Sequence, residues 1–246
     1  MEYFYITDSG KIRDHNEDSV DIVKNKNEEY LLLVADGMGG HRAGEVASNI
    51  AITHLGKSFQ QLDTVGDKEK AINWLKETVS EVNLLIYRYS EQNPTSQGLG
   101  TTLVLCLLTK DYLLFGNIGD SSGFVFKNKK LHKITVDHTL VNLLVNSGEL
   151  TEEEAKDHPK KNVLMRALGA TTTVEMDIFD VEVDVDGVLL CSDGLTNMLT
   201  EEQISRVLNE NTSLEEKLKK LVLKCNNRGG TDNISIACLL KGGEGV

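Results

Sequence analysis

Four aspartates stand beside glycines where apolar runs of the sequence end or begin: Asp36, Asp120, Asp193 and Asp232. A carboxylate at a strand end is held firmly and still faces solvent, so we expect the four to converge on one site. Carboxylates gathered at neutral pH repel one another unless cations neutralise them, and hard oxygen ligands favour Mg²⁺ or Mn²⁺ over Zn²⁺. An Asp-Gly pair alone is typical of an ordinary turn, but the whole set predicts a multi-metal site.

The segment Gly10–Asp18 adds a cation and two more carboxylates. Arg13 carries a permanent charge on a planar fork that suits two phosphate oxygens. Glu17 and Asp18 bring oxygens that can reach a metal ion or its waters. The alternative interpretation, for Arg13 in particular, is a solvated charged loop.

The pattern Arg-x-x-Asn-Glu-Asp followed by the four aspartates resembles the metal-dependent protein serine/threonine phosphatases of the type 2C class (the PPM family), especially the compact bacterial members. The matching segments follow the family's order over nearly the whole chain: Gly10–Asp18, Val34–His41, Gly98–Thr102, Asn117–Ser121, Val136–Val141, Leu164–Gly169, Leu190–Leu195 and Gly230–Ile234. The resemblance implies a sandwich of two antiparallel sheets, flanked by pairs of helices, with metals in a cleft at one end.

The resemblance also implies a role for each core residue. Asp36 is expected to bridge two metals, and Gly37 to offer its carbonyl oxygen to one of them. Asp193 and Asp232 are expected to complete the shell of the other metal. A water that bridges the two ions then loses its proton near neutral pH and attacks phosphorus in line, without a covalent phospho-enzyme.

Further residues surround this pair in the family pattern. The resemblance implies that Glu17 and Asp18 hold metal-bound waters and that Arg13 grips the substrate phosphate. Asp120, together with Asp193, matches the position that binds a third metal in bacterial members. We therefore expect Mn²⁺ or Mg²⁺ as the cofactor, with two core ions and a third. The expected partners are phosphoserine and phosphothreonine proteins and a cognate serine/threonine kinase.

Two positions depart from the family pattern. Many eukaryotic relatives carry histidine after the Asp-Gly pair, as a proposed acid for the leaving alkoxide, whereas this chain has Met38. His41, His15 or a metal-bound water are the candidate substitutes, although lone histidines are more often structural. The arginine usual after Gly-Asp-Ser is replaced by Ser122, for which we expect altered packing or surface charge without loss of activity.

The elements that position these residues follow from hydrophobic periodicity. Helical patterns cover Gly44–Lys57 and Lys68–Gln92, and capping boxes beginning at Thr151, Thr200 and Ser213 start later helices. The runs of strand character are Tyr3–Thr7, Ser19–Lys24, Glu29–Ala35, Thr101–Leu108, Tyr112–Asn117, Gly123–Lys127, Val174–Val183, Val188–Cys191 and Ile234–Leu240.

Runs of strands that alternate with helix pairs favour an α+β fold over a doubly wound sheet. With the resemblance, the pattern predicts a β-sandwich flanked by helix pairs in α-β-β-α layers. We expect one catalytic domain over residues 1–241, with a mobile flap at about 138–168 and a disordered tail at 242–246.

Composition limits where such a protein works. The net charge of −12 argues against nucleic acid and anionic membranes as partners, since both favour a basic surface. The N-terminus has no signal-peptide pattern, and no apolar run approaches the roughly 20 residues of a membrane helix. The cysteines stand singly in mostly apolar surroundings, at 106, 191, 225 and 238, as in a reduced cytoplasmic protein. Nothing requires more than a monomer.

Other chemistries fit the sequence less well. No cysteine begins a Cys-x5-Arg signature, and no Walker pattern is present. An EF-hand starting at Asp14 fails because Ser19 and Asn25 replace its glycine and glutamate. A nuclease could use the same carboxylates, but the acidic composition disfavours a nucleic-acid substrate. The remaining alternative, a non-catalytic pseudophosphatase that binds phosphoproteins, would be signalled by loss of a core aspartate, and all are present.

Overall fold

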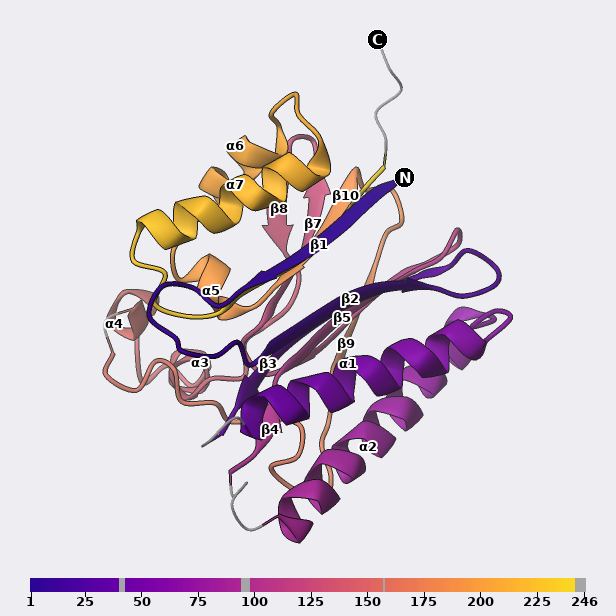
Figure 1. Ribbon diagram of the computed structural model, residues 1–246, viewed down its shortest axis with the longest axis horizontal. Coiled ribbons are helices and arrows are strands. Elements are labelled where there is room, and N and C mark those ends of the chain that lie inside the picture. The colour runs from indigo at the N-terminus through magenta and orange to yellow at the C-terminus, as the bar shows by residue number, and fades with distance from the viewer. Residues whose placement is uncertain (40–42, 94–97, 157, 242–246) are drawn as a thin grey trace.

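The computed structural model describes residues 1–39, 43–93, 98–156 and 158–241. Two antiparallel sheets face each other, and a pair of helices covers the outer face of each, which gives four layers (Figure 1). This is the predicted α+β sandwich. The expected tail at 242–246 lies outside the described residues.

Each sheet is assembled from strands far apart in the chain. The first sheet has the order β1 (Glu2–Asp8), β11 (Ile234–Leu240), β10 (Gly187–Cys191), β7 (Ser122–Lys127) and β8 (Lys130–Lys133). The second has the order β2 (Asp18–Lys24), β3 (Tyr30–Met38), β5 (Leu103–Leu108), β6 (Leu113–Ile118) and β9 (Asp177–Val181), with β4 (Gly100–Thr101) beside the end of β3.

The apolar residues divide into three packed layers. Phe115 lies in the cluster between the sheets. Phe59 belongs to the cluster under α1 (Ala43–Gln61) and α2 (Lys68–Gln92), and Phe124 to the cluster under α6 (Glu201–Leu208) and α7 (Leu214–Asn227). Strands β5 and β6 are buried along their whole length, because side chains on both of their faces meet another layer. This explains why they read as continuous apolar runs.

The shorter helices lie near one end of the sandwich. They are α3 (Leu140–Asn146) and α4 (Glu152–Lys156), between β8 and β9, and α5 (Asp193–Thr196) after β10. The capping boxes predicted at Thr200 and Ser213 are present. Thr151 and Glu154 also exchange side-chain and backbone hydrogen bonds at the start of α4, so the start signals of the later helices are confirmed.

Some boundaries differ from the sequence prediction. The run Thr101–Leu108 is two strands, because the chain leaves the ladder at Thr102. Strand β8 was not predicted, because its lysine-rich sequence hides the alternation of apolar and polar residues that is typical of a strand. A tight turn produces it, in which Asn128 and Lys129 have φ values of 53° and 63°, and β8 pairs back along β7.

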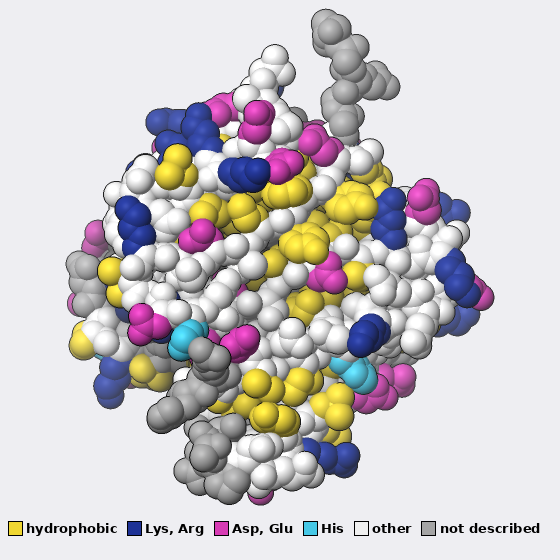
Figure 2. Space-filling model, viewed as in Figure 1, with side chains coloured by type: hydrophobic (Ala, Val, Ile, Leu, Met, Phe, Trp, Pro, Cys, Tyr) yellow, Lys and Arg dark blue, Asp and Glu magenta, His cyan; other side chains and the backbone are white. Residues whose placement is uncertain are grey.

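The surface and the thiols agree with the composition. Acidic and basic side chains are mixed over the face in Figure 2, and apolar side chains gather in a band across its centre.

All four cysteines are buried and free, and burial raises the pKa of the Cys238 thiol to about 12. Within the described ranges, no helix has the length and apolar character needed to cross a membrane.

The end of β3 makes an unusually close backbone contact with the start of α1. A Cβ added to Gly37 would lie 2.1 Å from the carbonyl oxygen of Gly44 and 2.5 Å from that of Glu17. Backbone atoms cannot move aside as a flexible side chain can. Only glycine therefore lets β3, α1 and the segment before β2 meet here.

Gly37→Ala should destabilise the fold by at least about 3 kcal/mol, because the added methyl group overlaps backbone on two sides. The matched control is Gly56→Ala within α1, where the nearest atom to the added carbon is a Val23 methyl at 3.5 Å. Alanine should stabilise that helix by about 0.5–1 kcal/mol. Urea unfolding of both variants in excess chelator measures the difference; equal stabilities would contradict this packing.

Candidate active site

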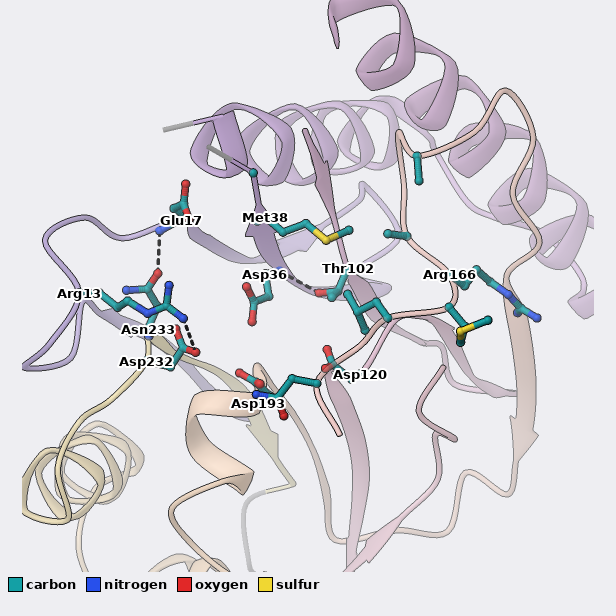
Figure 3. A pocket seen from close by; sticks show the side chains of 17 residues that line it. Arg13, Glu17, Asp36, Met38, Thr102, Asp120, Arg166, Asp193, Asp232 and Asn233 are labelled. Atoms are coloured by element: carbon teal, nitrogen blue, oxygen red, sulfur yellow. Dashed lines mark hydrogen bonds and ion pairs between the residues drawn. The ribbon is translucent and has the colours of Figure 1, made fainter. Parts of the chain in front are cut away.

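A cavity of about 460 Å³ opens at the end of the sandwich where β3, β6 and β10 end and β11 begins. Antiparallel pairing brings the ends of β3 and β6 to one end of the second sheet, and it brings the end of β10 beside the start of β11 in the first sheet. Seven of the eight predicted site residues line the cavity: Arg13, Glu17, Asp36, Gly37, Asp120, Asp193 and Asp232. Figure 3 shows the four aspartates around it, with Arg13 beside Asp232. The predicted convergence of the carboxylates is therefore present.

Asp36 lies inside β3, which continues to Met38, beyond the predicted strand end at Ala35. Its N–H donates to the Thr102 hydroxyl at 2.9 Å. Its carbonyl oxygen accepts from the Thr102 N–H and from the Thr101 hydroxyl, each at 2.9 Å. The backbone is thereby fixed, and the side chain is directed to the cavity. Thr102 was missed as a site residue, although it stands in a family segment.

Asp18 lies behind the cavity wall, only 7% exposed and directly opposite Asp36 in the β2–β3 ladder. The Ser192 hydroxyl donates to its Oδ2 at 2.7 Å. Its Oδ1 is buried without a donor among the described residues, and so is Oδ1 of Asp193. Buried carboxylate oxygens without donors are costly unless a cation offsets them, so the residues present fit a bound cation.

Burial and mutual repulsion disfavour the ionised forms of these carboxylates. Burial, followed by the charge of Asp18, raises the pKa of Asp36 well above its ordinary value. Burial, with repulsion from Asp193, raises the pKa values of Asp18 and Asp120 to about 7. Burial, with repulsion from Asp232, raises the pKa of Asp193 to about 6. A divalent cation in the cavity would reverse this effect by favouring the ionised forms.

The geometry suits ions that keep part of their water shell. Among the described residues, no group of three or more His, Cys, Asp or Glu side chains is arranged to hold a metal ion, and Asp232 is paired with Arg13. Magnesium and similar hard ions are commonly held by one or two carboxylates with waters. Gly37 also lines the cavity.

The N-terminal loop is attached to the loop before β11. Lys11 and Ile12 donate their N–H groups to the carbonyl oxygen of Gly230, and Arg13 Nη2 donates to Asp232 Oδ2 at 2.8 Å. The Arg13 side chain is 51% exposed, so the guanidinium remains accessible from the cavity.

Asn233 connects the same two loops and was missed as a positioning residue. Its Oδ1 accepts from the Glu17 N–H at 2.9 Å. Its Nδ2 donates to the carbonyl oxygens of Ser9 and His15. Only a tertiary contact reveals this role, because the sequence signal is one polar residue after an aspartate.

The wall opposite Arg13 is more apolar and was not predicted in detail. It includes Met38, Leu164, Met165, Ala167 and Ala170. Arg166 also lines the cavity on this side, far from Arg13 (Figure 3).

The residues that depart from the family pattern are placed as follows. His15 is not among the described residues that line the cavity, and His41 lies outside the described residues. Ser122 is 1% exposed, and its hydroxyl has no partner within the described part of the chain. Position 122 therefore lies in the interior, which agrees with the expected change in packing, and the expectation that activity is retained stays a prediction.

Comparison with known proteins matches this arrangement to one family. A sequence profile of protein phosphatase 2C matches residues 11–231. The chain belongs to the protein phosphatase 2C family. It is thus a protein serine/threonine phosphatase, which acts on phosphoserine and phosphothreonine proteins.

Three relatives show how far the similarity extends. The serine/threonine phosphatase stp of Listeria welshimeri is 42% identical over 237 residues, which cover 96% of this chain and 94% of that protein. The crystal structure of Stp1 from Staphylococcus aureus is 34% identical and superimposes with a TM-score of 0.92 over 98% of this chain and 95% of its own. The catalytic domain of the phosphatase PstP, in complex with two manganese ions, is 34% identical with a TM-score of 0.81 over 96% of each chain.

The raised pKa values predict an unusual pH dependence of stability without metal. Between the ordinary value of 3.8 and the folded values of about 6 to 7, the folded chain holds protons on Asp18, Asp120 and Asp193 that the unfolded chain releases. Raising the pH through this window therefore favours unfolding. We expect Mn²⁺ to raise the Tm more at pH 8 than at pH 5, because it binds the ionised carboxylates.

Thermal denaturation at both pH values, in chelator and in Mn²⁺, measures this effect. Asp120→Asn should make the metal-free Tm depend less on pH, since one titrating group is removed. A metal-free Tm that stays constant or rises from pH 5 to pH 7 would contradict the assigned shifts.

Proposed function

We propose that this phosphatase hydrolyses phosphoserine and phosphothreonine with a water held between two divalent ions, Mn²⁺ or Mg²⁺, at the carboxylate cavity. The observation that carries the proposal is the convergence of Asp36, Asp193 and Asp232 from separate strand ends onto one cavity. The buried carboxylate oxygens without donors support it, as does the manganese complex of the PstP relative.

The residues divide into ligands and supports. Asp36 and the Gly37 carbonyl would hold one ion, with Asp36 shared with a second ion that Asp193 and Asp232 also hold. Glu17 would orient a water of the ion shells from the cavity wall, and Asp18 would do so from behind Asp36. When bound, the core ions would supply a water deprotonated near neutral pH, and a third ion near Asp120 would supply a bound water acidic enough to donate a proton.

Arg13 binds the substrate in this proposal. Its guanidinium is paired with Asp232 in the structure and is half exposed, so it can exchange this contact for two oxygens of a phosphate dianion. Asp232 then becomes free to act as a ligand. The exchange places one positive charge at the phosphoryl group, where negative charge spreads in the transition state.

Protonation of the leaving alkoxide needs a source other than Met38, whose thioether carries no acidic proton. Asp120 would hold an ion whose bound water provides the proton, because Asp120 lines the same cavity and faces the charge of Asp193. We assign this role to Asp120 and Asp193 together.

The proposal extends to the domain organisation, oligomeric state and location of the enzyme. We propose a single catalytic domain over residues 1–241, with a flap at about 138–168, that works as a monomer. Its four buried free thiols suit a reducing cytoplasm. A serine/threonine kinase would supply its phosphoprotein substrates.

Phosphate release from a phosphothreonine peptide, with Mn²⁺ and with excess chelator, tests the proposed function. The described residues that line the cavity include no cysteine or serine nucleophile, so chelator should abolish turnover and added Mn²⁺ or Mg²⁺ should restore it. Full turnover in chelator would exclude the two-ion mechanism. Peptide binding without turnover under all metal conditions would favour the pseudophosphatase alternative.

Asp120→Ala tests the assignment of the leaving-group proton. The variant should fold, retain two bound ions and lose at least about tenfold in kcat on phosphothreonine. Its loss on an aryl phosphate should be much smaller, because a phenolate leaves without needing a proton. Steady-state kinetics on both substrates, with an ion count by calorimetry, measure the split. An equal, small effect on both substrates would remove Asp120 from this role.

A further inference from the structure

The turn that presents Asp120 to the cavity is centred on Gly119, which has a φ of +102°. A Cβ there would lie 2.6 Å from a Thr102 methyl carbon, so the turn is tightly confined. Asp120 follows it directly, and the direction of its carboxylate depends on how the Gly119 peptide is held.

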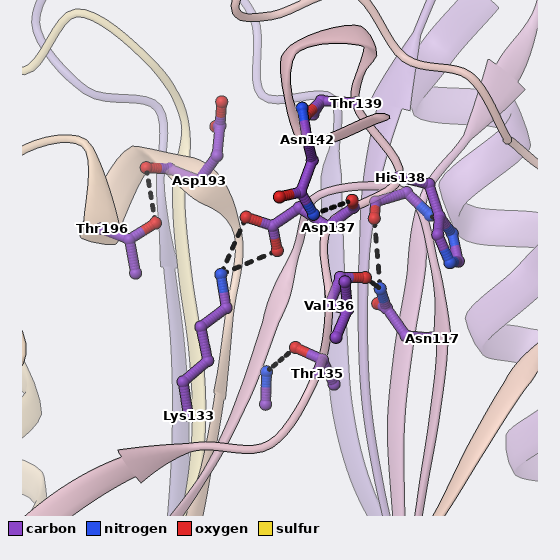
Figure 4. A network of polar contacts seen from close by, with 12 residues as sticks. Asn117, Lys133, Thr135, Val136, Asp137, His138, Thr139, Asn142, Asp193 and Thr196 are labelled. Atoms are coloured by element: carbon purple, nitrogen blue, oxygen red, sulfur yellow. Dashed lines mark hydrogen bonds and ion pairs between the residues drawn. The ribbon is translucent and has the colours of Figure 1, made fainter. Parts of the chain in front are cut away.

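One residue binds both backbone groups of Gly119. The Gly119 N–H donates to Nδ1 of His138 at 3.1 Å, and the Gly119 carbonyl accepts from the His138 N–H at 2.9 Å. Asn117 Nδ2 donates to the same carbonyl at 3.1 Å and to Val136 O at 2.9 Å. Figure 4 shows the chain from Lys133 to Thr139 lying against Asn117. The turn is therefore fastened to the segment that contains His138.

These contacts fix the tautomer of the imidazole. A backbone N–H can only donate, so Nδ1 of His138 accepts, and in the neutral ring the proton lies on Nε2. Nε2 is 3.1 Å from Oδ2 of Asp177, which accepts it. The His138 side chain is only 9% exposed, which protects both hydrogen bonds from competition with water.

Arg166 holds Asp177, the residue that accepts from His138 Nε2, in place. Its Nη1 donates to Asp177 Oδ1 at 2.6 Å and to the Glu175 carbonyl at 3.0 Å. Nη1 also lies 3.2 Å from His138 Nε2, but Nε2 carries the proton in this tautomer and cannot accept from the guanidinium. Partial burial acts against ionisation of Asp177, but the hydrogen bonds from His138 and Arg166 outweigh it and lower its pKa. Asp177 therefore remains a charged acceptor that holds the ring in one orientation.

The backbone of His138 also holds the base of the segment that carries α3 and α4. The Met165 N–H donates to the His138 carbonyl at 2.8 Å, and the Leu140 N–H donates to Val163 O at 2.8 Å. Thr139 and Leu164 form an antiparallel bridge between these bonds. The two ends of the segment thus meet at His138, beside the wall formed by Leu164 and Met165.

We propose that His138 is a positioning residue that aims Asp120 at its ion by holding Gly119 through Nδ1, and that it joins this turn to the base of the 138–168 segment. The inference rests on the proposed function, because it takes Asp120 as an ion ligand. His138 itself touches neither substrate nor core ligand in this account.

Two substitutions test the two nitrogens of the His138 ring separately. In His138→Asn, the side-chain oxygen occupies the place of Nδ1 and can still accept from Gly119. In His138→Gln, the longer amide can reach Asp177 but leaves no acceptor at the Nδ1 position. His132→Gln is the matched control, because His132 is an exposed residue of β8.

Calorimetric titration with Mn²⁺ and kinetics on two substrates give the readouts. His138→Gln should raise the Kd of the weakest Mn²⁺ class about tenfold, which is the effect of one lost hydrogen bond. It should lower kcat on phosphothreonine by a similar factor and change the aryl-phosphate rate at most about twofold. His138→Asn should stay within about threefold of the parent in each measurement, and His132→Gln should match the parent.

A spectroscopic measurement tests the hydrogen bonds without reference to activity. A long-range ¹H–¹⁵N spectrum of the parent should show the His138 proton on Nε2, and the Gly119 amide should exchange with solvent faster in His138→Gln than in His138→Asn. A proton on Nδ1, or equal exchange in both variants, overturns the proposal. The proposal is also overturned if His138→Gln and His138→Asn lose Mn²⁺ affinity equally, by an amount that follows the decrease in their Tm.

Asp120→Ala distinguishes this proposal from the proposed function. Loss of the weakest Mn²⁺ class in Asp120→Ala, with that class unchanged in His138→Gln, overturns the role of His138 alone. An unchanged class in Asp120→Ala overturns the third ion and, with it, this role of His138.

Discussion

The structure depends on the repulsion among carboxylates that the fold buries together. Asp18 and Asp36 face each other across one ladder, and Asp193 and Asp232 approach from the other sheet. Burial deprives Asp18, Asp36 and Asp193 of water, so the pKa values of these three carboxyl groups rise. A fold that keeps such groups ionised needs positive charge at this point, which Arg13 supplies in part and divalent ions would supply in full.

The architecture makes this arrangement rigid. Asp36, Asp120, Asp193 and Asp232 lie at or beside the ends of strands β3, β6, β10 and β11, whose residues are mostly buried in the three apolar layers. The close contact of Gly37 with Gly44 fixes β3 against α1, and Asn233 fastens the N-terminal loop to the loop before β11. The ligands are therefore pre-organised, so little conformational entropy is lost when ions bind.

Much of the fold and the carboxylate set could be predicted from sequence, because buried strands and strand-end aspartates leave local patterns. Strand β8 could not, since its stability comes from pairing with β7 and not from its lysine-rich sequence. The predicted strand stopped at Ala35, before Asp36, because the sequence does not reveal that β4 extends the pairing of β3. The contacts of Thr102, Asn233 and His138 are tertiary, and local periodicity carries no information about them.

The central claim is that Asp36, Asp193 and Asp232 hold a pair of divalent ions. Anomalous scattering at the manganese edge, from crystals grown with Mn²⁺, locates such ions directly. The account predicts two strong peaks in the cavity on either side of the Asp36 carboxylate, one of them also contacting Asp193 and Asp232. A single peak, or peaks that leave Asp36 without a bound ion, would contradict it.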